Sequence, residues 1–184
     1  MDPIRGPYDS DLVLKLLDAR VGDTVADIGC GYGGHARRLR AQLGPRGRVL
    51  GRDVDELTLE KARRAGLPDG CEFALSGRAD VRIAPGTLDR AYMNQVWGTV
   101  EHQETRGELT RSLFQALKPG GELLVVQVPK LSAYDQGESF MPTLEDATRA
   151  AGFECGRRWQ IWDRERGDGP AWVFEFRRPF AVAE

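Results

Sequence analysis

The stretch of chain that most constrains the fold reads VADIGCGYGG and runs from Val25 to Gly34. A short apolar segment leads directly into four closely spaced glycines, and the HARRLRAQLG segment that follows has the apolar spacing of a helix. Glycine permits turns that other residues avoid, and it lets a ligand approach the backbone closely. Ligands of open α/β sheets bind at the carboxyl ends of the strands. The sequence therefore predicts a strand-to-helix turn that forms the floor of a ligand pocket.

Strand-like and helix-like segments alternate along the rest of the chain, with no repeat or linker between them. The predicted strands are 21–29, 47–54, 71–77, 88–96, 121–129, 155–162 and 171–178, and the predicted helices are 11–20, 35–44, 55–66, 105–117 and 143–152. Thr143 is the predicted cap of the last helix, and residues 79–88 are expected to carry a short helix or none. The order predicts an α/β fold: a Rossmann-like, doubly wound, mostly parallel seven-stranded sheet with a C-terminal antiparallel β-hairpin. Residues 1–184 are expected to form a single domain.

Composition narrows the classes of partner. The net charge of −2 gives no general attraction to nucleic acid, and no apolar run approaches the roughly 20 residues that cross a bilayer. Three scattered cysteines argue against a disulfide framework. Two histidines and no cysteine pair leave almost no ligands for zinc, so no metal is expected. We expect a cytoplasmic protein that acts on a small molecule, with no membrane partner and with nucleic acid disfavoured. The oligomeric state, a homodimer included, stays open.

Two carboxylates distinguish between the ligands that such a turn can bind. The glycine spacing fits dinucleotide sites and methyltransferases equally well, and a purely structural tight turn is a third reading. Asp27, at the end of its strand, would repel a pyrophosphate but suits a ligand with an ammonium and a sulfonium. Asp53, at the end of the next strand, can accept hydrogen bonds from both hydroxyls of an adenosine ribose. Together they favour S-adenosylmethionine.

Four segments in this order, VADIGCGYGG, VLGRDVDELTLEKAR, LDRAYMNQVW and LKPGGELLVV, resemble the successive motifs of class I S-adenosylmethionine-dependent methyltransferases. The segment PYDSDLVLKLLDARVGDTVADIG resembles the small single-domain enzymes of the UbiE-like type. The resemblance implies S-adenosyl-L-methionine as the cofactor and methyl transfer to a small-molecule acceptor as the activity.

The resemblance also implies which residues hold the cofactor. Asp27 would take the methionine ammonium, Asp53 would hold the ribose, and Val54 would pack on adenine. Asn94 or Gln95 would face the sulfonium and the incoming nucleophile. The implied cofactor-binding residues are Asp27, Gly29, Cys30, Gly31, Gly33, Asp53, Val54, Arg78, Ala79, Asn94 and Gln95.

The chain departs from the family at the adenine position. The family often carries an acidic residue shortly after its third strand, where it accepts a hydrogen bond from the adenine amino group. The matching stretch here is SGRAD, with Arg78 near that position. Two alternatives stay open: Asp80 replaces the acid through a shifted loop, or the backbone of Ala79 makes the contact.

No residue is convincing as a catalyst. Methyl transfer from a sulfonium is an in-line displacement, so alignment and exclusion of water are the main tasks of the protein. His102 is the candidate general base, and a solvated surface position is its alternative. Tyr8, Trp97 and Tyr134 are candidates for an apolar lid over the acceptor, with core packing as the alternative for aromatic residues.

Two other functions stay open. One is a protein of this fold that binds S-adenosylmethionine in a non-methylating role, as a scaffold or a cofactor-assisted cyclase. The other is an NAD(P)-dependent oxidoreductase, which Asp27 and the absence of a Tyr-x-x-x-Lys pair disfavour.

Overall fold

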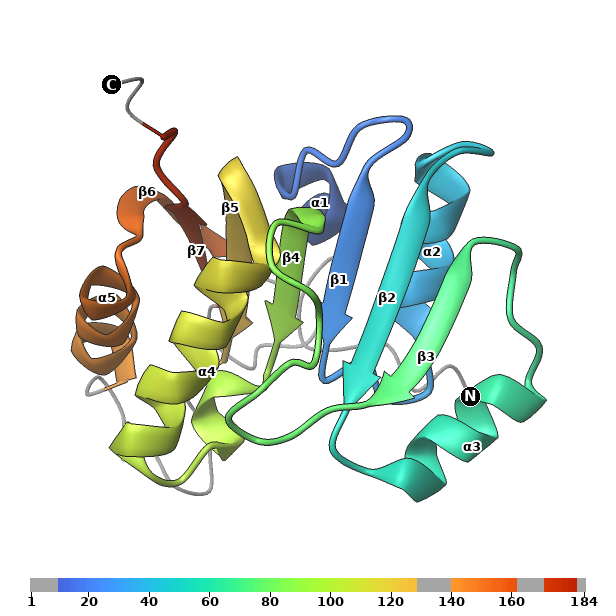
Figure 1. Cartoon of the computed structure of the whole chain (residues 1–184), viewed down its shortest axis with the longest axis horizontal. Helices are drawn as coiled ribbons and strands as arrows, with labels where there is room; N and C mark the ends of the chain where they lie inside the picture. The colour runs from blue at the N-terminus through green and yellow to red at the C-terminus, as the bar shows by residue number, and fades with distance from the viewer. Residues whose placement is uncertain (1–9, 129–139, 162–170, 182–184) are drawn as a thin grey trace.

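The predicted alternation of strands and helices is present in the computed structural model, which describes residues 10–128, 140–161 and 171–181 (Figure 1). In chain order the elements are α1 (Ser10–Leu16), β1 (Thr24–Ile28), α2 (Gly34–Gln42), β2 (Arg48–Asp53), α3 (Glu56–Arg64), β3 (Cys71–Leu75), β4 (Leu88–Asn94), the 3-10 turn η1 (Trp97–Thr99), α4 (Gln103–Ala116), β5 (Leu117–Gln127), α5 (Phe140–Ala151), β6 (Glu154–Ile161) and β7 (Ala171–Arg177). The described residues between β3 and β4 contain no helix, as the turn-rich sequence there allowed.

The seven strands form one sheet in the order β3-β2-β1-β4-β5-β7-β6. Neighbours from β3 to β5 pair in parallel, and β7 runs antiparallel to both β5 and β6. The predicted doubly wound, mostly parallel sheet with a terminal antiparallel hairpin is therefore confirmed. The chain winds outward in both directions from the β1–β4 pair, and open α/β sheets bind ligands at such a switch point.

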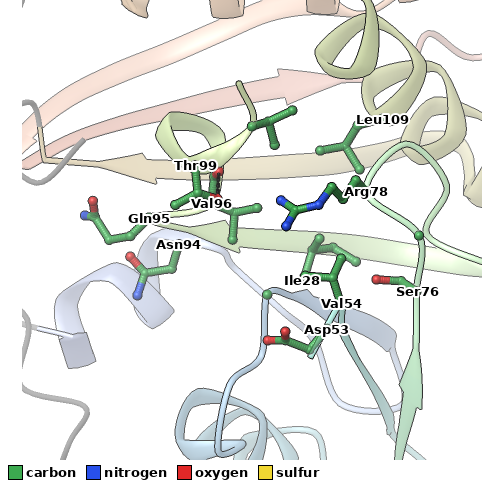
Figure 2. A pocket seen from close by; sticks show the side chains of 13 residues that line it. Ile28, Asp53, Val54, Ser76, Arg78, Asn94, Gln95, Val96, Thr99 and Leu109 are labelled. Carbon is green, nitrogen blue, oxygen red and sulfur yellow. Dashed lines mark hydrogen bonds between the residues drawn. The ribbon is translucent and has the colours of Figure 1, made fainter. Parts of the chain in front are cut away.

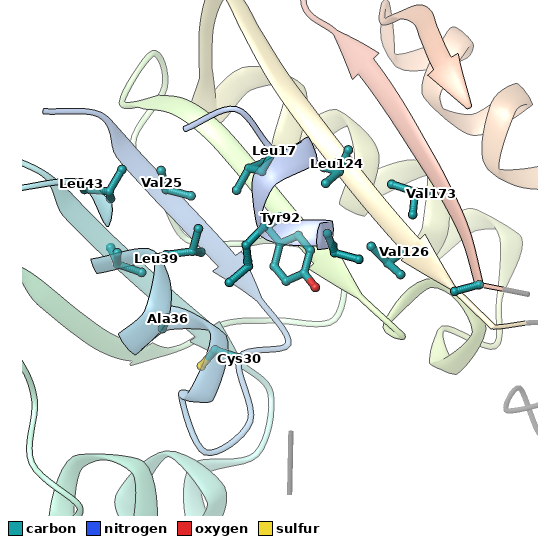
Figure 3. Close-up of a cluster of buried hydrophobic side chains, with 14 of the residues drawn as sticks. Leu17, Val25, Cys30, Ala36, Leu39, Leu43, Tyr92, Leu124, Val126 and Val173 are labelled. Carbon is teal, nitrogen blue, oxygen red and sulfur yellow. The ribbon is translucent and has the colours of Figure 1, made fainter. Parts of the chain in front are cut away.

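Helices cover both faces of the sheet because side chains alternate along each strand. In β1, Val25 belongs to one buried cluster and its neighbour Ala26 to the other. The first cluster lies under α1, α2 and α3, and in it Leu17 and Leu39 pack together with Tyr92 of β4 (Figure 3). The second lies under α4 and α5. Strands buried on both faces explain the nearly continuous apolar runs in the sequence.

The start of α5 corrects one prediction. The helix begins at Phe140, so Thr143 lies inside it and its prediction as the cap is wrong. Pro142 precedes the predicted helix 143–152 but lies in the first turn of α5. Proline is tolerated there because backbone N–H groups of the first turn need no partner within the helix. None of the helices in the described ranges is long and apolar enough to span a membrane.

The start of β5 also differs from the prediction. KPGG was expected to separate α4 from a strand beginning at Gly121, whereas β5 begins at Leu117. The Gly120 N–H donates to the Arg178 carbonyl at 2.8 Å, and the Arg178 N–H donates to the Gly121 carbonyl at 2.9 Å. Gly120 has a φ of 79°, and the register between β4 and β5 shifts at this point, so this part of β5 is irregular. The chain after β7 holds the two glycines through a contact between distant segments, which no local sequence pattern predicts.

Candidate functional site

A cavity of about 230 Å³ opens at the carboxyl ends of β1, β2, β3 and β4, at the switch point of the sheet (Figure 2). Sites that enclose a whole ligand usually measure about 300–1,000 Å³. The cavity therefore fits one part of an extended cofactor. Its lining residues are Ile28, Gly29, Asp53, Val54, Ser76, Gly77, Arg78, Asn94, Gln95, Val96, Thr99, Val100 and Leu109.

Three of the four glycines of the loop, Gly29, Gly31 and Gly33, have positive φ angles and different structural roles. Gly29 and Gly33 have φ angles of 68° and 76°, and a Cβ at either would lie 2.2 Å from Val96 or 2.3 Å from Phe73. Gly31 also has a positive φ, 52°, but an added Cβ would meet nothing within 4 Å. The first and third glycines are therefore required by packing within the protein. The middle one leaves its backbone open to a ligand.

Asp53 joins the glycine loop to the end of β2. Its Oδ2 accepts a hydrogen bond from the Gly31 N–H at 2.8 Å, and its Oδ1 accepts one from the Asp55 N–H at 3.0 Å. Each carboxylate oxygen keeps the capacity to accept a second bond. Asp53 thus presents two fixed hydrogen-bond acceptors at the cavity wall, an arrangement that fits the vicinal hydroxyls of a ribose. Asp55 caps α3 by accepting a hydrogen bond from the Leu57 N–H.

Asp27 lies behind the glycine loop and does not line the cavity. Its side chain is only 2% exposed, and its Oδ2 has no hydrogen-bond partner among the described residues. The pKa of this carboxyl is raised to about 7, mainly because burial disfavours the charged form. A hydrogen bond from the Ala36 N–H lowers the pKa, and the negative charge of Asp53 raises it. A cation beside the unpartnered oxygen would stabilise the ionised form. This orphaned atom fits the ammonium group of a bound amino acid.

Carboxamide side chains organise the end of β4. The Gln95 Oε1 accepts hydrogen bonds from Gln127 Nε2 at 3.1 Å and from the Val128 N–H at 3.0 Å. The Gln127 Oε1 in turn accepts one from the Gly98 N–H at 3.1 Å. Gln95 has a φ of 57°, a costly conformation for a residue with a side chain. Sequence reasoning missed Gln127, whose only signal is a polar residue inside the apolar run LLVVQV.

The structure brings six of the implied cofactor residues to the cavity and leaves five behind it. Gly29, Asp53, Val54, Arg78, Asn94 and Gln95 line the cavity, whereas Asp27, Cys30, Gly31, Gly33 and Ala79 do not. Burial raises the pKa of the Cys30 thiol above its ordinary value, so a reactive thiolate is disfavoured there. The apolar and hydroxyl lining from Ser76, Val96, Thr99, Val100 and Leu109 was not predicted, because it comes from loops and a helix without a motif.

In the loop after β3, Asp80 is bound within the protein, whereas an adenine contact from the Ala79 backbone stays a prediction. The Asp80 Oδ1 accepts hydrogen bonds from the Arg82 N–H at 2.9 Å and from the Ser112 hydroxyl at 3.0 Å. Its carbonyl accepts a further bond from the Gly77 N–H at 2.8 Å. Asp80 thus holds its own loop against α4 and does not line the cavity. Arg78 occupies the cavity side of this loop instead.

The candidates for the lid and for the base do not gather at the cavity. Trp97 is completely buried in the second core, with the Arg106 guanidinium 5.3 Å from its ring centre, so its prediction as part of a lid is wrong. It follows the last residues of β4 into the 3-10 turn, which directs the indole inward. His102 is exposed at the N-cap position of α4 and does not line the cavity, in agreement with its alternative as a surface residue. Tyr8 and Tyr134 lie outside the described residues.

The cavity has the size and lining to hold a nucleoside, and the buried carboxyl of Asp27 can bind a cation. The lining of the cavity carries one acidic group, Asp53, and one basic group, Arg78, among otherwise neutral side chains. Across the described part of the chain, no group of three or more His, Cys, Asp or Glu side chains could hold a metal ion. The described site is therefore suited to binding and aligning an organic cofactor.

Known proteins resemble this chain in both sequence and fold. The family model described as "Methyltransferase domain" matches residues 25–121. Methyltransferase GfsG of Streptomyces halstedii is 26% identical over 132 residues, which are 70% of this chain and 46% of that protein. The ubiquinone/menaquinone biosynthesis C-methyltransferase UbiE of Pseudomonas fluorescens is 28% identical over 142 residues, 71% of this chain and 54% of that protein. The chain thus spans about half the length of these curated relatives.

A solved structure extends the likeness to nearly the whole chain. The crystal structure of a SAM dependent methyltransferase from Aquifex aeolicus superposes with a TM-score of 0.75. The match covers 94% of this chain and 90% of that one, at 21% sequence identity. At this identity the likeness shows a shared fold, the one described above.

Proposed function

This chain belongs to the class I S-adenosylmethionine-dependent methyltransferase family, and on that premise we propose that it transfers the cofactor's methyl group to a small-molecule acceptor. S-Adenosylmethionine is the cofactor of this family. The small-molecule acceptor is supported by the net charge of −2, which gives no general attraction to nucleic acid. The relative from Pseudomonas fluorescens, named for ubiquinone and menaquinone biosynthesis, also favours a small organic acceptor.

One observation carries this proposal: the Asp53 carboxylate is held at the cavity wall by the Gly31 N–H. The bond fixes an acceptor for ribose hydroxyls against the open backbone of the glycine loop. The neighbouring apolar side chains of Val54 and Ile28 supply a surface for the purine. A dinucleotide would instead place a pyrophosphate at the loop, near the carboxyl group of Asp27, and two like charges there repel.

Each part of the site has a separate task in the proposed reaction. The cofactor supplies an electrophilic methyl group on a sulfonium. Asp53 holds the ribose, and Asp27 receives the ammonium and ionises beside it. Asn94 and Gln95, at the end of β4, line the cavity, and the sequence resemblance implies that they face the methyl and the acceptor. The apolar residues Val96, Val100 and Leu109 exclude water around the nucleoside. Alignment of acceptor and methyl then supplies the main acceleration.

We infer that the protein acts in the cytoplasm. All three cysteines, Cys30, Cys71 and Cys155, are free thiols, as expected in a reducing compartment. The oligomeric state, including a homodimer, has no bearing on this proposal because the described site is formed within one chain.

The proposal is tested by measuring cofactor binding and product formation on a matched pair of variants. Asp53→Ala removes the ribose acceptor, and Asp69→Ala removes an exposed carboxylate in the turn before β3. We expect Asp53→Ala to weaken binding of S-adenosylmethionine by about 10- to 100-fold, because two hydrogen bonds to a charged group are lost. Asp69→Ala should bind as the unaltered protein does.

Product formation distinguishes the remaining alternatives. The unaltered protein, incubated with S-adenosylmethionine and a broad panel of small-molecule acceptors, should yield S-adenosylhomocysteine with at least one of them. Tight binding without product from any acceptor would favour the non-methylating role. Binding of NADH in place of S-adenosylmethionine would favour the oxidoreductase.

A further inference from the structure

Gln95 stands at the end of β4 in a backbone conformation that glycine would adopt at lower cost. Its φ angle is 57°, in the left-handed region that favours glycine. Such conformations persist where the surrounding contacts fix them, and they concentrate at functional sites. The residue lines the cavity, and Figure 2 shows its carboxamide on the same side as Asn94 and away from Arg78. A side chain held there at this cost is a candidate for ligand binding.

Backbone groups fix the orientation of this carboxamide. A backbone N–H can only donate, so the Gln127 atom that receives the Gly98 N–H at 3.1 Å is its oxygen. The Gln127 Nε2 therefore donates to the Gln95 Oε1 at 3.1 Å. The same Oε1 accepts a second bond, from the Val128 N–H at 3.0 Å. With its oxygen held by two donors, the carboxamide of Gln95 must present its nitrogen in the remaining direction.

The Gln95 Nε2 is left without a protein partner. It is shielded from solvent and makes no hydrogen bond to any residue that the structure describes. An amide nitrogen carries two N–H donors and accepts no hydrogen bond. Because an unpaired buried donor is destabilising, its presence beside a ligand cavity points to an acceptor that a bound molecule supplies. The positively charged sulfonium and ammonium of the cofactor repel such a donor, so its partner is a different group.

We propose that the Gln95 Nε2 donates a hydrogen bond to an oxygen of the methyl acceptor, and that this acceptor is a small molecule with a carbonyl, carboxylate or hydroxyl oxygen close to the attacked atom. The inference rests on the proposed function, since it takes methyl transfer to a small molecule as its premise. Gln95 selects the acceptor, and Gln127 is the positioning residue that directs the donor. A compound without this oxygen leaves the buried N–H groups unpaired, so the site rejects it.

The first test compares acceptors that differ in one oxygen-bearing group. Three pairs share the attacked atom, which is an oxygen, a nitrogen or a sulfur: catechol and phenol, anthranilate and aniline, thiosalicylate and thiophenol. They are added to the acceptor panel, and formation of S-adenosylhomocysteine by the full chain is measured for every compound. We expect the fastest acceptor of the panel to carry an oxygen close to the attacked atom. Its analogue without that oxygen should have a kcat/KM lower by about 100-fold or more.

The variant Gln95→Glu assigns the effect to the donor. It keeps the oxygen that Gln127 and Val128 bind and replaces Nε2 with a carboxylate oxygen. At about pH 8, kcat/KM for the fastest acceptor should fall by about 100-fold, while the dissociation constant for S-adenosylhomocysteine changes by less than about threefold. As pH falls, protonation supplies an O–H donor, so kcat/KM relative to the unaltered protein should rise. Gln42→Glu, the same change at an exposed residue of α2, should leave kcat/KM unaltered.

The outcomes separate this inference from the proposed function. A fastest acceptor with no oxygen close to the attacked atom would overturn the inference alone. So would an unchanged kcat/KM in Gln95→Glu, or a loss that does not recover as pH falls, in a variant that a thermal unfolding curve shows to be folded. An affinity for S-adenosylhomocysteine that is about tenfold lower in this variant would assign the donor to the cofactor, which also overturns it. Formation of no product from any acceptor would overturn the proposed function and the inference with it.

Discussion

Backbone groups hold the glycine-loop end of the site, whereas side chains hold the end formed by β4 and β5. At the first, the Gly31 N–H fixes Asp53 across a sequence separation of 22 residues. At the second, Gln95 and Gln127 bind each other through their carboxamides, 32 residues apart. The first end also contains the buried carboxyl of Asp27, while the second is built from neutral groups. The structure of the glycine-loop end should therefore depend on pH and on glycine conformation, whereas the structure of the β4–β5 end should depend on neither.

The largest expected effect concerns the pH dependence of the glycine-loop end. Burial raises the pKa of Asp27 to about 7 in the folded protein, from 3.8 as its ordinary value. The folded state therefore binds more protons than the unfolded state between these values, so this carboxyl lowers the free energy of unfolding as pH rises from about 4 to 7. The total is on the order of 4 kcal/mol. Asp27→Asn should remove this loss, as measured by urea unfolding across that pH range without ligand.

The same titration should appear in cofactor binding. The ammonium of the cofactor favours the ionised form of Asp27, so affinity should rise with pH up to about 7 and a proton should be released on binding. In Asp27→Asn the affinity should be lower and its dependence on pH in this range should vanish. A variant that keeps the pH dependence of both stability and binding would show that another group titrates. The two ends of the site would then not differ in their dependence on pH through Asp27.

The next effect separates two glycines within the loop. Gly33→Ala forces a side chain into a left-handed conformation and against Phe73, which should lower the free energy of unfolding by about 2–4 kcal/mol. Gly31→Ala meets no atom within 4 Å, so only the conformational strain of about 1–2 kcal/mol remains.

Cofactor binding should rank these two variants in the reverse order. Gly31→Ala places a methyl group on the open backbone beside Asp53, and it should weaken binding of S-adenosylhomocysteine more than Gly33→Ala does at a temperature where both are folded. Equal losses of stability in the two variants would show that packing against Phe73 does not restrict the third glycine.

The smallest effect concerns the carboxamide pair, defined as Gln95 and Gln127. Gln127→Leu removes the acceptor of the buried Gly98 N–H and one donor to Gln95, which should cost about 1–2 kcal/mol in the free energy of unfolding. The affinity for S-adenosylhomocysteine should change by less than about threefold, because the nucleoside cavity keeps Asp53 and the glycine loop. Gln42→Leu, on the exposed side of α2, is the matched control and should stay within about 0.5 kcal/mol.

The sequence predicts the glycine-loop end better than the other. Its determinants are local: a strand, a run of glycines, and an acid at the end of the next strand. The doubly wound order and the antiparallel hairpin also follow from local periodicity, because the apolar spacing of each segment indicates whether it is a strand or a helix. The pairing of Asp53 with Gly31 brings together two motifs that the sequence already marks.

The remaining features depend on contacts between distant segments. Trp97 is buried because η1 turns it into the second core, a direction that the adjacent motif does not encode. The early start of β5 depends on the chain after β7, which pairs with Gly120 and Gly121. Gln127 finds its partner only when β4 and β5 lie side by side. The sequence makes Asp80 a candidate for adenine binding, whereas in the structure its carboxylate binds the Arg82 N–H and the Ser112 hydroxyl.

The central claim is that the glycine-loop end binds an adenosylated amino acid and excludes a dinucleotide. Calorimetric titration of the unaltered protein with S-adenosylhomocysteine, and separately with NADH, tests it most directly. We expect saturable binding of S-adenosylhomocysteine at one molecule per chain and no binding of NADH. Saturable binding of NADH by a protein that does not bind S-adenosylhomocysteine would contradict it.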